Sequence, residues 1–96
     1  MTYLLSKQAE EDIIDIYVTG AELFGLIQAK HYHQQLTTIF QFLSDNPKAA
    51  PVREEIIPQV RIHPFGSHII IYQLDADNNV FVIRVRHAHE DWLNDT

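Results

Sequence analysis

The 96-residue chain contains no cysteine, only three glycines, and far fewer basic than acidic residues. Without cysteine, the fold contains no disulfide and no thiolate metal site. With 7 Lys and Arg against 13 Asp and Glu, the formal net charge is −6 at pH 7. Proteins that bind nucleic acid mainly through phosphates are usually basic. We therefore expect no strong, sequence-independent binding of RNA or DNA.

The sequence also has no apolar run near the roughly 20 residues needed to span a bilayer. Its N-terminus, MTYLLSKQAEEDI, lacks the basic segment and apolar core of a signal peptide. We therefore expect a cytoplasmic protein without membrane contact. A hydrophobic content of 46% is ordinary for a globular chain, and the length fits one domain covering residues 1–96.

The first half predicts two amphipathic helices. Ser6 is a candidate N-cap for the first helix, and Gly25 is its candidate C-terminal stop. The second helix ends in the breaker cluster 44–47, and a loop over 47–58 then crosses to the second half. Apolar residues at steps of three and four define the buried faces. These are Ala9, Ile13, Ile16, Tyr17 and Phe24 in the first helix, and Ala29, Tyr32, Leu36, Ile39, Phe40 and Leu43 in the second.

From Gln59 onward the apolar period changes to two, which predicts strands over 59–63, 68–74 and 80–86 with turns at 64–67 and 75–79. The apolar segment 2–5 is a candidate strand that pairs with one of them. The expected fold class is α+β: an N-terminal strand, an antiparallel helical hairpin, and a three-stranded antiparallel run in one sheet packed by the helices. The expected core residues are Ile69 to Ile71, Phe81, Ile83 and Val85, with Val80, Val82, Arg84 and Arg86 on the opposite face of the last strand. Tyr32 and Tyr72 are expected to pack in the core with their hydroxyls at its edge.

The sequence gives little evidence for a catalytic site or a metal site. Ser67 and His68 are adjacent, and neighbouring strand residues point to opposite faces, which argues against a Ser–His pair. His31 and His33 diverge by about 200° on a helix. His87 and His89 would share a strand face, with Glu90 and Asp91 close by, but no further ligand stands at a diagnostic spacing. We expect no metal, no cofactor and no catalytic residue.

Three arginines leave two interpretations open. Arg84 and Arg86 share a strand face, and Arg61 lies on a neighbouring strand, so the three could bind phosphate as in a ribonuclease. Such a site also needs a general acid and a general base, and histidine is the only candidate for either role. The arginines would otherwise keep an exposed sheet face soluble. The single tryptophan, Trp92, either closes an edge of the core or anchors a partner.

Several segments together resemble the ParE branch of the RelE/ParE superfamily, the toxins of bacterial type II toxin–antitoxin modules. They are the helical hairpin, Asn46-Pro47, Val60-Arg61, GSHIIIY at 66–72 and VIRVRHAHEDW at 82–92, so the resemblance covers nearly the whole chain. The chain departs from the RelE branch, which carries a terminal tyrosine where Trp92 stands here. His89 occupies a position where arginine is common in both branches.

The resemblance implies a toxin that is not a hydrolase and that binds DNA gyrase, trapping it with broken DNA. It also implies a cognate ribbon-helix-helix antitoxin whose C-terminal segment wraps the toxin and folds as it binds, giving a hetero-oligomer. We expect antitoxin contacts on the helical hairpin. The expected gyrase-facing residues are Arg61, His63, Arg84, Arg86, His87, His89 and Trp92.

Two alternatives remain open at this stage. The first is a RelE-like, ribosome-dependent mRNA endoribonuclease in which Arg61, Arg84 and Arg86 hold the phosphate and His87 or His89 moves protons. The second is a binding module that has lost toxicity and persists in a regulatory complex.

Overall fold

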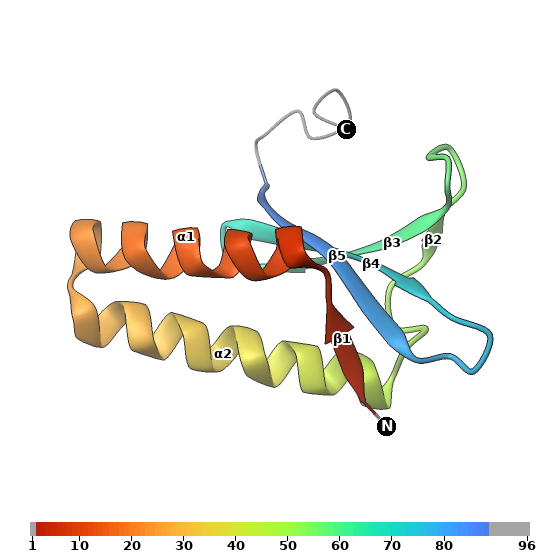
Figure 1. Cartoon of the computed structure of the whole chain (residues 1–96), viewed down its shortest axis with the longest axis horizontal. Coiled ribbons are helices and arrows are strands. Elements are labelled where there is room, and N and C mark those ends of the chain that lie inside the picture. The colour runs from red at the N-terminus through yellow and green to blue at the C-terminus, as the bar shows by residue number, and fades with distance from the viewer. Residues whose placement is uncertain (1, 89–96) are drawn as a thin grey trace.

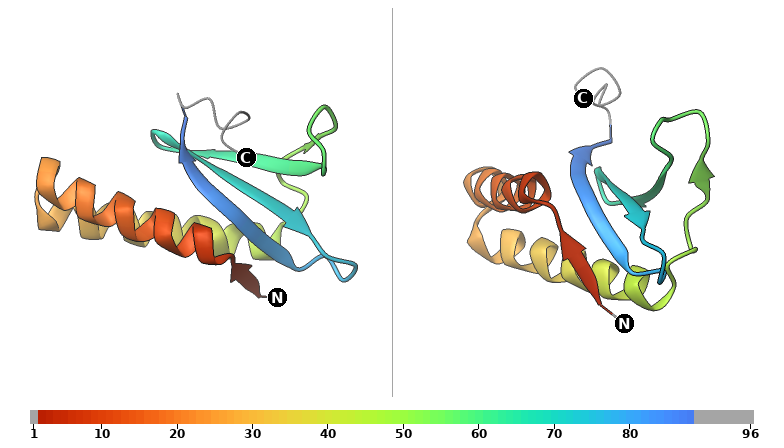
Figure 2. Two further views of the ribbon diagram at one scale, coloured as in Figure 1. Left: turned by 45° about the horizontal axis from the view of Figure 1, so that its top comes forward. Right: turned by 45° about the vertical axis from the view of Figure 1, so that its right-hand side comes forward.

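A computed structural model describes residues 2–88 of the chain. The helices α1 (Lys7–Phe24) and α2 (Leu26–Asp45) lie side by side as an antiparallel hairpin against one face of the sheet (Figures 1 and 2). The end of the hairpin where the two helices connect extends past the sheet (Figure 1). The strands are β1 (Tyr3–Leu5), β2 (Val52–Arg53), β3 (Val60–Phe65), β4 (His68–Leu74) and β5 (Val80–His87).

The five strands form one sheet in the order β1-β5-β4-β3-β2. β1 runs parallel to β5, with Tyr3 opposite Val80, and all other neighbours are antiparallel. The predicted α+β class, the N-terminal strand, the helical hairpin and the three-stranded antiparallel run are confirmed. The prediction of a plain loop over 47–58 is wrong at β2, which is too short to produce a visible period.

Local sequence signals set the helix boundaries. The Ser6 hydroxyl accepts a hydrogen bond from the Ala9 N–H at 2.9 Å and donates one to the Ile83 carbonyl at 2.5 Å. The predicted N-cap is therefore confirmed, and the same side chain ties α1 to β5. Gly25 ends α1 with a φ of 92°, a conformation that favours glycine.

The hydrophobic core lies between the hairpin and the sheet. Tyr72 and Leu43 are fully buried in it. Its other buried members are Ala9, Leu36, Phe40, Ala50, Ile70, Val80, Val82 and Val85. The predicted apolar faces of the helices are confirmed except for Phe24, which is 69% exposed.

The predicted faces of the last strand are wrong because β5 contains a bulge. Ile71 pairs with Arg84 but the next residue, Tyr72, pairs with Val82, so Ile83 is an extra residue on β5. The bulge shifts the alternation, and Val80, Val82 and Val85 face the helices. Phe81 is instead 40% exposed, and Ile83 and Ile69 are only half-buried.

The turn between β3 and β4 is shorter than predicted. β3 continues through Pro64 to Phe65, which pairs with His68, so the turn consists of Gly66 and Ser67. Proline is tolerated where its missing N–H faces the edge of a sheet, and β2 pairs β3 only at residues 60 and 61. Gly66 has a φ of 55°, and a Cβ atom there would lie 2.6 Å from the Tyr32 hydroxyl oxygen. The turn therefore packs closely on α2.

Candidate protein-docking site

The connected end of the hairpin carries large apolar side chains that the sheet does not cover. Ile27 is 87% exposed, and Phe24 and Leu23 are 69% and 68% exposed. Leu26 is also more than half exposed, and so is Ile14 on α1. Contiguous exposed apolar surface on a soluble protein commonly marks a contact surface for another molecule.

A groove of about 470 Å³ runs between the two helices toward the end of the sheet. We call it the hairpin groove. Its apolar lining comes from both helices and includes Ile13, Ile16, Leu23, Phe24, Ala29 and Leu36. A groove of this shape between helices is suited to an apolar segment of another chain.

The sheet end of the hairpin groove is polar. His68 on β4 and His87 on β5 are direct partners in the sheet register, and their rings meet edge to face with centroids 5.4 Å apart. The Tyr32 hydroxyl lies 2.7 Å from His68 Nδ1 and 3.3 Å from the carbonyl oxygen of Phe65. The Ser67 hydroxyl is 3.4 Å from the same nitrogen, a longer contact than that of Tyr32.

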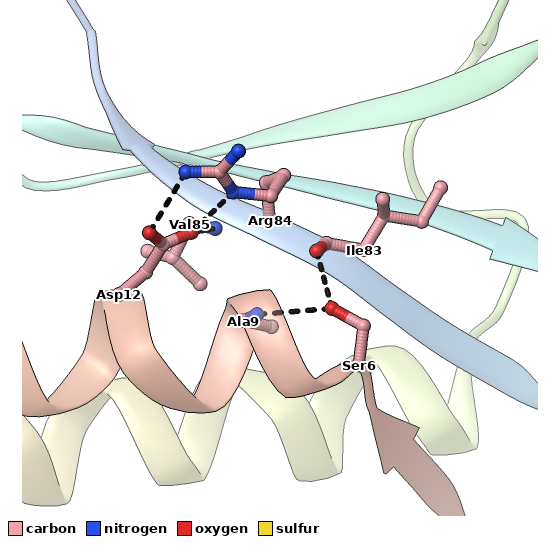
Figure 3. Close-up of polar contacts among 6 residues, drawn as sticks. All are labelled: Ser6, Ala9, Asp12, Ile83, Arg84 and Val85. Atoms are coloured by element: carbon pink, nitrogen blue, oxygen red, sulfur yellow. Dashed lines mark hydrogen bonds and ion pairs between the residues drawn. The ribbon is translucent and has the colours of Figure 1, made fainter. Parts of the chain in front are cut away.

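An ion pair joins α1 to β5 beyond the end of β1 (Figure 3). Arg84 donates two hydrogen bonds to the Asp12 carboxylate, at 2.7 Å from Nε and 3.0 Å from Nη2. The same carboxylate accepts the Val85 backbone N–H at 3.0 Å. Both side chains are largely buried, and charge-assisted hydrogen bonds of this bidentate kind are strong.

A second pair of polar contacts anchors the segment that follows α2. Arg61 Nη1 donates to the Ala50 carbonyl at 2.6 Å. The Tyr72 hydroxyl donates to the Pro47 carbonyl at 2.9 Å, and burial raises the pKa of this hydroxyl above its ordinary value of 10.0. The predicted position of Tyr72, with its ring in the core and its hydroxyl at the edge, is confirmed. The prediction for Tyr32 is wrong, because its ring is only half-buried and lines the hairpin groove outside the core.

The predicted gyrase-facing residues fall on different parts of the molecule. Arg61 and His63 pair with Tyr72 and Ile70, which face the helices, and His63 packs beside Phe42.

Arg84 and Arg86 pair with Ile71 and Ile69, on the other face of the sheet. The structure therefore does not bring Arg61 together with Arg84 and Arg86, whereas it brings His87 to His68. His89 and Trp92 lie outside the described residues, and the role of the whole set in partner binding stays a prediction.

The sequence contained a signal for the exposed end of the hairpin that the helical pattern obscured. Residues 23–27 read LFGLI, four large apolar residues around the glycine that separates the helices. The place of His68 opposite His87 had no signal in the sequence, because the turn length alone would put His68 opposite Arg86 and the bulge at Ile83 shifts the register by one residue. Among residues 2–88, no three His, Asp or Glu side chains are arranged to hold a metal ion. Neither described helix has the length and apolar character required to cross a membrane.

Comparison with known proteins identifies the family. A family model described as the ParE toxin of the type II toxin–antitoxin system parDE matches residues 3–92. The chain belongs to the ParE toxin family.

Named relatives of this ParE-family chain agree with that assignment. It is 29% identical over 89 residues to Toxin ParE1 of Mycobacterium tuberculosis (strain CDC 1551 / Oshkosh), an alignment that covers 93% of this chain and 91% of the relative. It is 28% identical over 85 residues to Toxin ParE1 of Caulobacter vibrioides, covering 88% and 86% of the two chains. The predicted resemblance is therefore confirmed.

The fold also matches a chain in a solved structure titled "Chromosomal ParDE TA system from P. aeruginosa". The TM-score is 0.75 at 18% sequence identity, with 91% of this chain and 95% of the other covered. At this identity the match supports the fold alone.

Proposed function

We propose that this ParE-family toxin inhibits DNA gyrase by direct protein contact, without a cofactor, and that a cognate antitoxin neutralises it by occupying the hairpin groove and covering the exposed apolar residues at the connected end of the hairpin. Gyrase acts on bacterial DNA, so the toxin would work in the cytoplasm. The observation that carries the docking part of the proposal is the exposed apolar surface at the connected end of the hairpin, where Ile27 is 87% exposed.

The shape of the hairpin groove supports an antitoxin segment as its occupant. Apolar residues line it from both helices, as in grooves that receive an amphipathic helix with anchors three and four residues apart. A segment that is disordered alone can fold as it covers such a surface. Burying the exposed leucine, isoleucine and phenylalanine side chains would contribute roughly 25 cal/mol for each Å² removed from water.

The contacts of the arginines support action by contact rather than RNA cleavage. Two of the donors of Arg84 are already taken by Asp12, and Arg61 donates to the Ala50 carbonyl. The three arginines proposed for phosphate binding lie on two faces of the sheet, so they do not converge on one phosphate. The net charge of −6 also opposes binding to ribosomal RNA. His63, Arg86 and His87 stay candidates for the gyrase-facing surface.

A supercoiling assay with purified gyrase tests the toxic activity. We expect the toxin at micromolar concentration to inhibit supercoiling and to accumulate linear DNA after protein digestion, because the cleaved complex is trapped. Arg86→Glu should weaken both effects. Unimpaired supercoiling with no trapped complex would contradict the proposal, and ribosome toeprints showing mRNA cuts would favour the RelE-like alternative.

A matched pair of isoleucine variants tests antitoxin docking. Ile27→Asp at the connected end of the hairpin should abolish binding of the antitoxin encoded beside the toxin gene. Ile57→Asp, at a residue 93% exposed in the segment before β3, should leave binding unchanged. Equal losses in both variants, or none in Ile27→Asp, would place the antitoxin elsewhere.

A further inference from the structure

We propose that the connected end of the hairpin is a self-association surface, through which two copies of this toxin form a symmetric dimer. The inference goes beyond the proposed function and does not depend on it, because it concerns the toxin alone. It is based on the segment 22–30, ELFGLIQAK, which contains the end of α1, Gly25 and the start of α2. We call this segment the hairpin tip.

The hairpin tip exposes enough apolar area for a weak dimer. Its four large apolar side chains are between 52% and 87% exposed; they are Leu23, Phe24, Leu26 and Ile27. At roughly 200 Å² for a fully exposed residue of this size, they present on the order of 500 Å² in each copy. Two tips in contact remove on the order of 1,000 Å² from water, which is the lower limit for a specific interface. We therefore expect a dissociation constant in the micromolar range.

The fold leaves the hairpin tip accessible to a second copy. The tip extends past the sheet at one end of the longest dimension of the molecule (Figure 1). Among residues 2–88, no strand lies beside it. Two tips can therefore approach each other while the two sheets stay apart.

The distribution of charge favours the hairpin tip over the rest of α1 as the contact between copies. The chain has a net charge of −6, and a net charge of one sign opposes self-association. The tip contains one carboxylate, that of Glu22, and one ammonium group, that of Lys30, so its formal charge is zero. The remainder of α1, residues 7–21, contains four carboxylates and one lysine. Two copies therefore repel each other less at their tips than along this part of α1.

The two charges of the hairpin tip also suit a twofold axis. Glu22 is on α1 and Lys30 is on α2, and both are exposed. In the part of the chain that the structure describes, neither side chain takes part in an ion pair. A symmetric interface is self-complementary, so a contact between Glu22 of one copy and the partner's Lys30 is formed twice. The tip thus combines a central apolar contact with two matched ion pairs.

Self-association covers side chains that also line the hairpin groove. Leu23 and Phe24 belong both to the hairpin tip and to the lining of the groove. If the antitoxin occupies the groove as proposed above, it excludes the second copy. The toxin dimer then has to dissociate before the antitoxin binds.

Sedimentation velocity of the purified toxin, free of antitoxin, tests the dimer. Between about 1 and 200 μM we expect the sedimentation coefficient to rise from that of a monomer to that of a dimer. Phe24→Asp should stay monomeric over this range, because it places a carboxylate in the apolar contact. Ile57→Asp, at a residue 93% exposed outside the tip, should dimerise as the unmodified toxin does. An unmodified toxin that stays monomeric throughout, or a Phe24→Asp variant that dimerises equally, would overturn the inference.

Reversing one charge tests the paired contacts. Glu22→Lys should weaken the dimer about tenfold, because both ion pairs become repulsive contacts. This weakening is opposite to the effect of net charge, since the substitution brings the chain closer to neutrality. Glu11→Lys makes the same change at an exposed position of α1 outside the tip and should dimerise at least as tightly as the unmodified toxin. Equal weakening in both variants would contradict the pairing.

A mixture of two charge variants separates a lost contact from structural damage. Glu22→Lys and Lys30→Glu should each dimerise poorly, but an equimolar mixture should form a heterodimer with the affinity of the unmodified toxin, because every facing pair again has opposite signs. A mixture that associates no better than either variant alone would overturn the inference. All these measurements use the toxin alone, so a failure of the antitoxin to bind would contradict the proposed function and leave the dimer standing.

Discussion

The two ends of the helical hairpin differ in what covers their apolar residues. At the sheet end, Leu36 and Leu43 of α2 are almost completely buried in the core that also contains residues of β4 and β5. At the connected end, Phe24 and Ile27 are mostly exposed because the sheet does not extend that far (Figure 1). The comparison shows that an amphipathic pattern predicts an apolar face of a helix, but not whether another element of the fold packs on that face. The same kind of face is core in one half of the hairpin and remains exposed in the other half, where we propose that a partner docks.

The largest expected difference between the two ends comes from a pair of leucine truncations. Leu43→Ala should lower the free energy of unfolding by about 2 to 5 kcal/mol, because it leaves a cavity in the core. Leu23→Ala, at a residue 68% exposed, should change it by no more than about 0.5 kcal/mol. Urea unfolding followed by circular dichroism measures both. Similar costs would mean that the two ends are packed alike.

The ion pair between Asp12 and Arg84 should have the next largest effect on the free energy of unfolding. Asp12→Ala removes the carboxylate that holds Arg84 and the Val85 N–H, and should cost about 2 to 3 kcal/mol in urea unfolding. Asp12→Asn retains an oxygen for the Val85 N–H and should cost less. Glu11→Ala, exposed on the same helix, serves as the control. The ion pair would be dispensable if the alanine and asparagine variants were both as stable as the control.

The Tyr72 hydroxyl should contribute less to the free energy of unfolding, and its contribution should depend on pH. Tyr72→Phe loses the hydrogen bond to Pro47 and should cost about 1 kcal/mol near neutral pH. Burial raises the pKa of Tyr72 in the folded state, so the unfolded chain loses this proton first as pH rises. The hydroxyl's stabilising contribution is therefore fully present below about pH 10 and is lost as pH rises above that value.

The measurement is the difference in unfolding free energy between the unmodified toxin and Tyr72→Phe as a function of pH. The difference should shrink or change sign above about pH 10. Tyr17→Phe, which alters a less buried tyrosine, provides the comparison. A constant difference across the alkaline range would show that Tyr72 ionises equally in both states.

The smallest expected effect on stability belongs to the connected end itself. Ile27→Ser should leave the unfolding free energy within about 0.5 kcal/mol of the unmodified toxin, because the side chain buries little area. The same variant should lose antitoxin binding measured by calorimetry. A marked loss of stability would show that the connected end is part of the core, and the comparison would fail.

Sequence signals predicted those features that depend on nearby residues. Ser6 and Gly25 fix the ends of α1 through contacts or dihedral angles within a few residues, and both were predicted. The segment GSHIIIY carried the family resemblance and the bounds of β4. The bulge at Ile83 was not predictable in this way. Two residues after it, the N–H of Val85 is held by the Asp12 carboxylate, which comes from a residue 73 positions earlier.

The exposed apolar end of the hairpin could not be located from the sequence for a related reason. Antitoxin contacts were expected on the hairpin, but exposure of Phe24 depends on where the sheet ends, and the helical period carries no such information. The pairing of His68 with His87 depends on the length of the turn between β4 and β5 and on the bulge at Ile83. Neither quantity can be read from one strand alone.

The parallel pairing of β1 with β5 has a consequence for how the toxin is made. Residues 3–5 find their strand partners at 80–82, so the first strand to be synthesised must wait for the last. Contacts between such distant residues are also slow to form, because a long loop has to close first. A ribosome that releases the chain before β5 therefore yields a protein with an unpaired first strand and no partner for Asp12. The fold is therefore complete only after β5 has been synthesised.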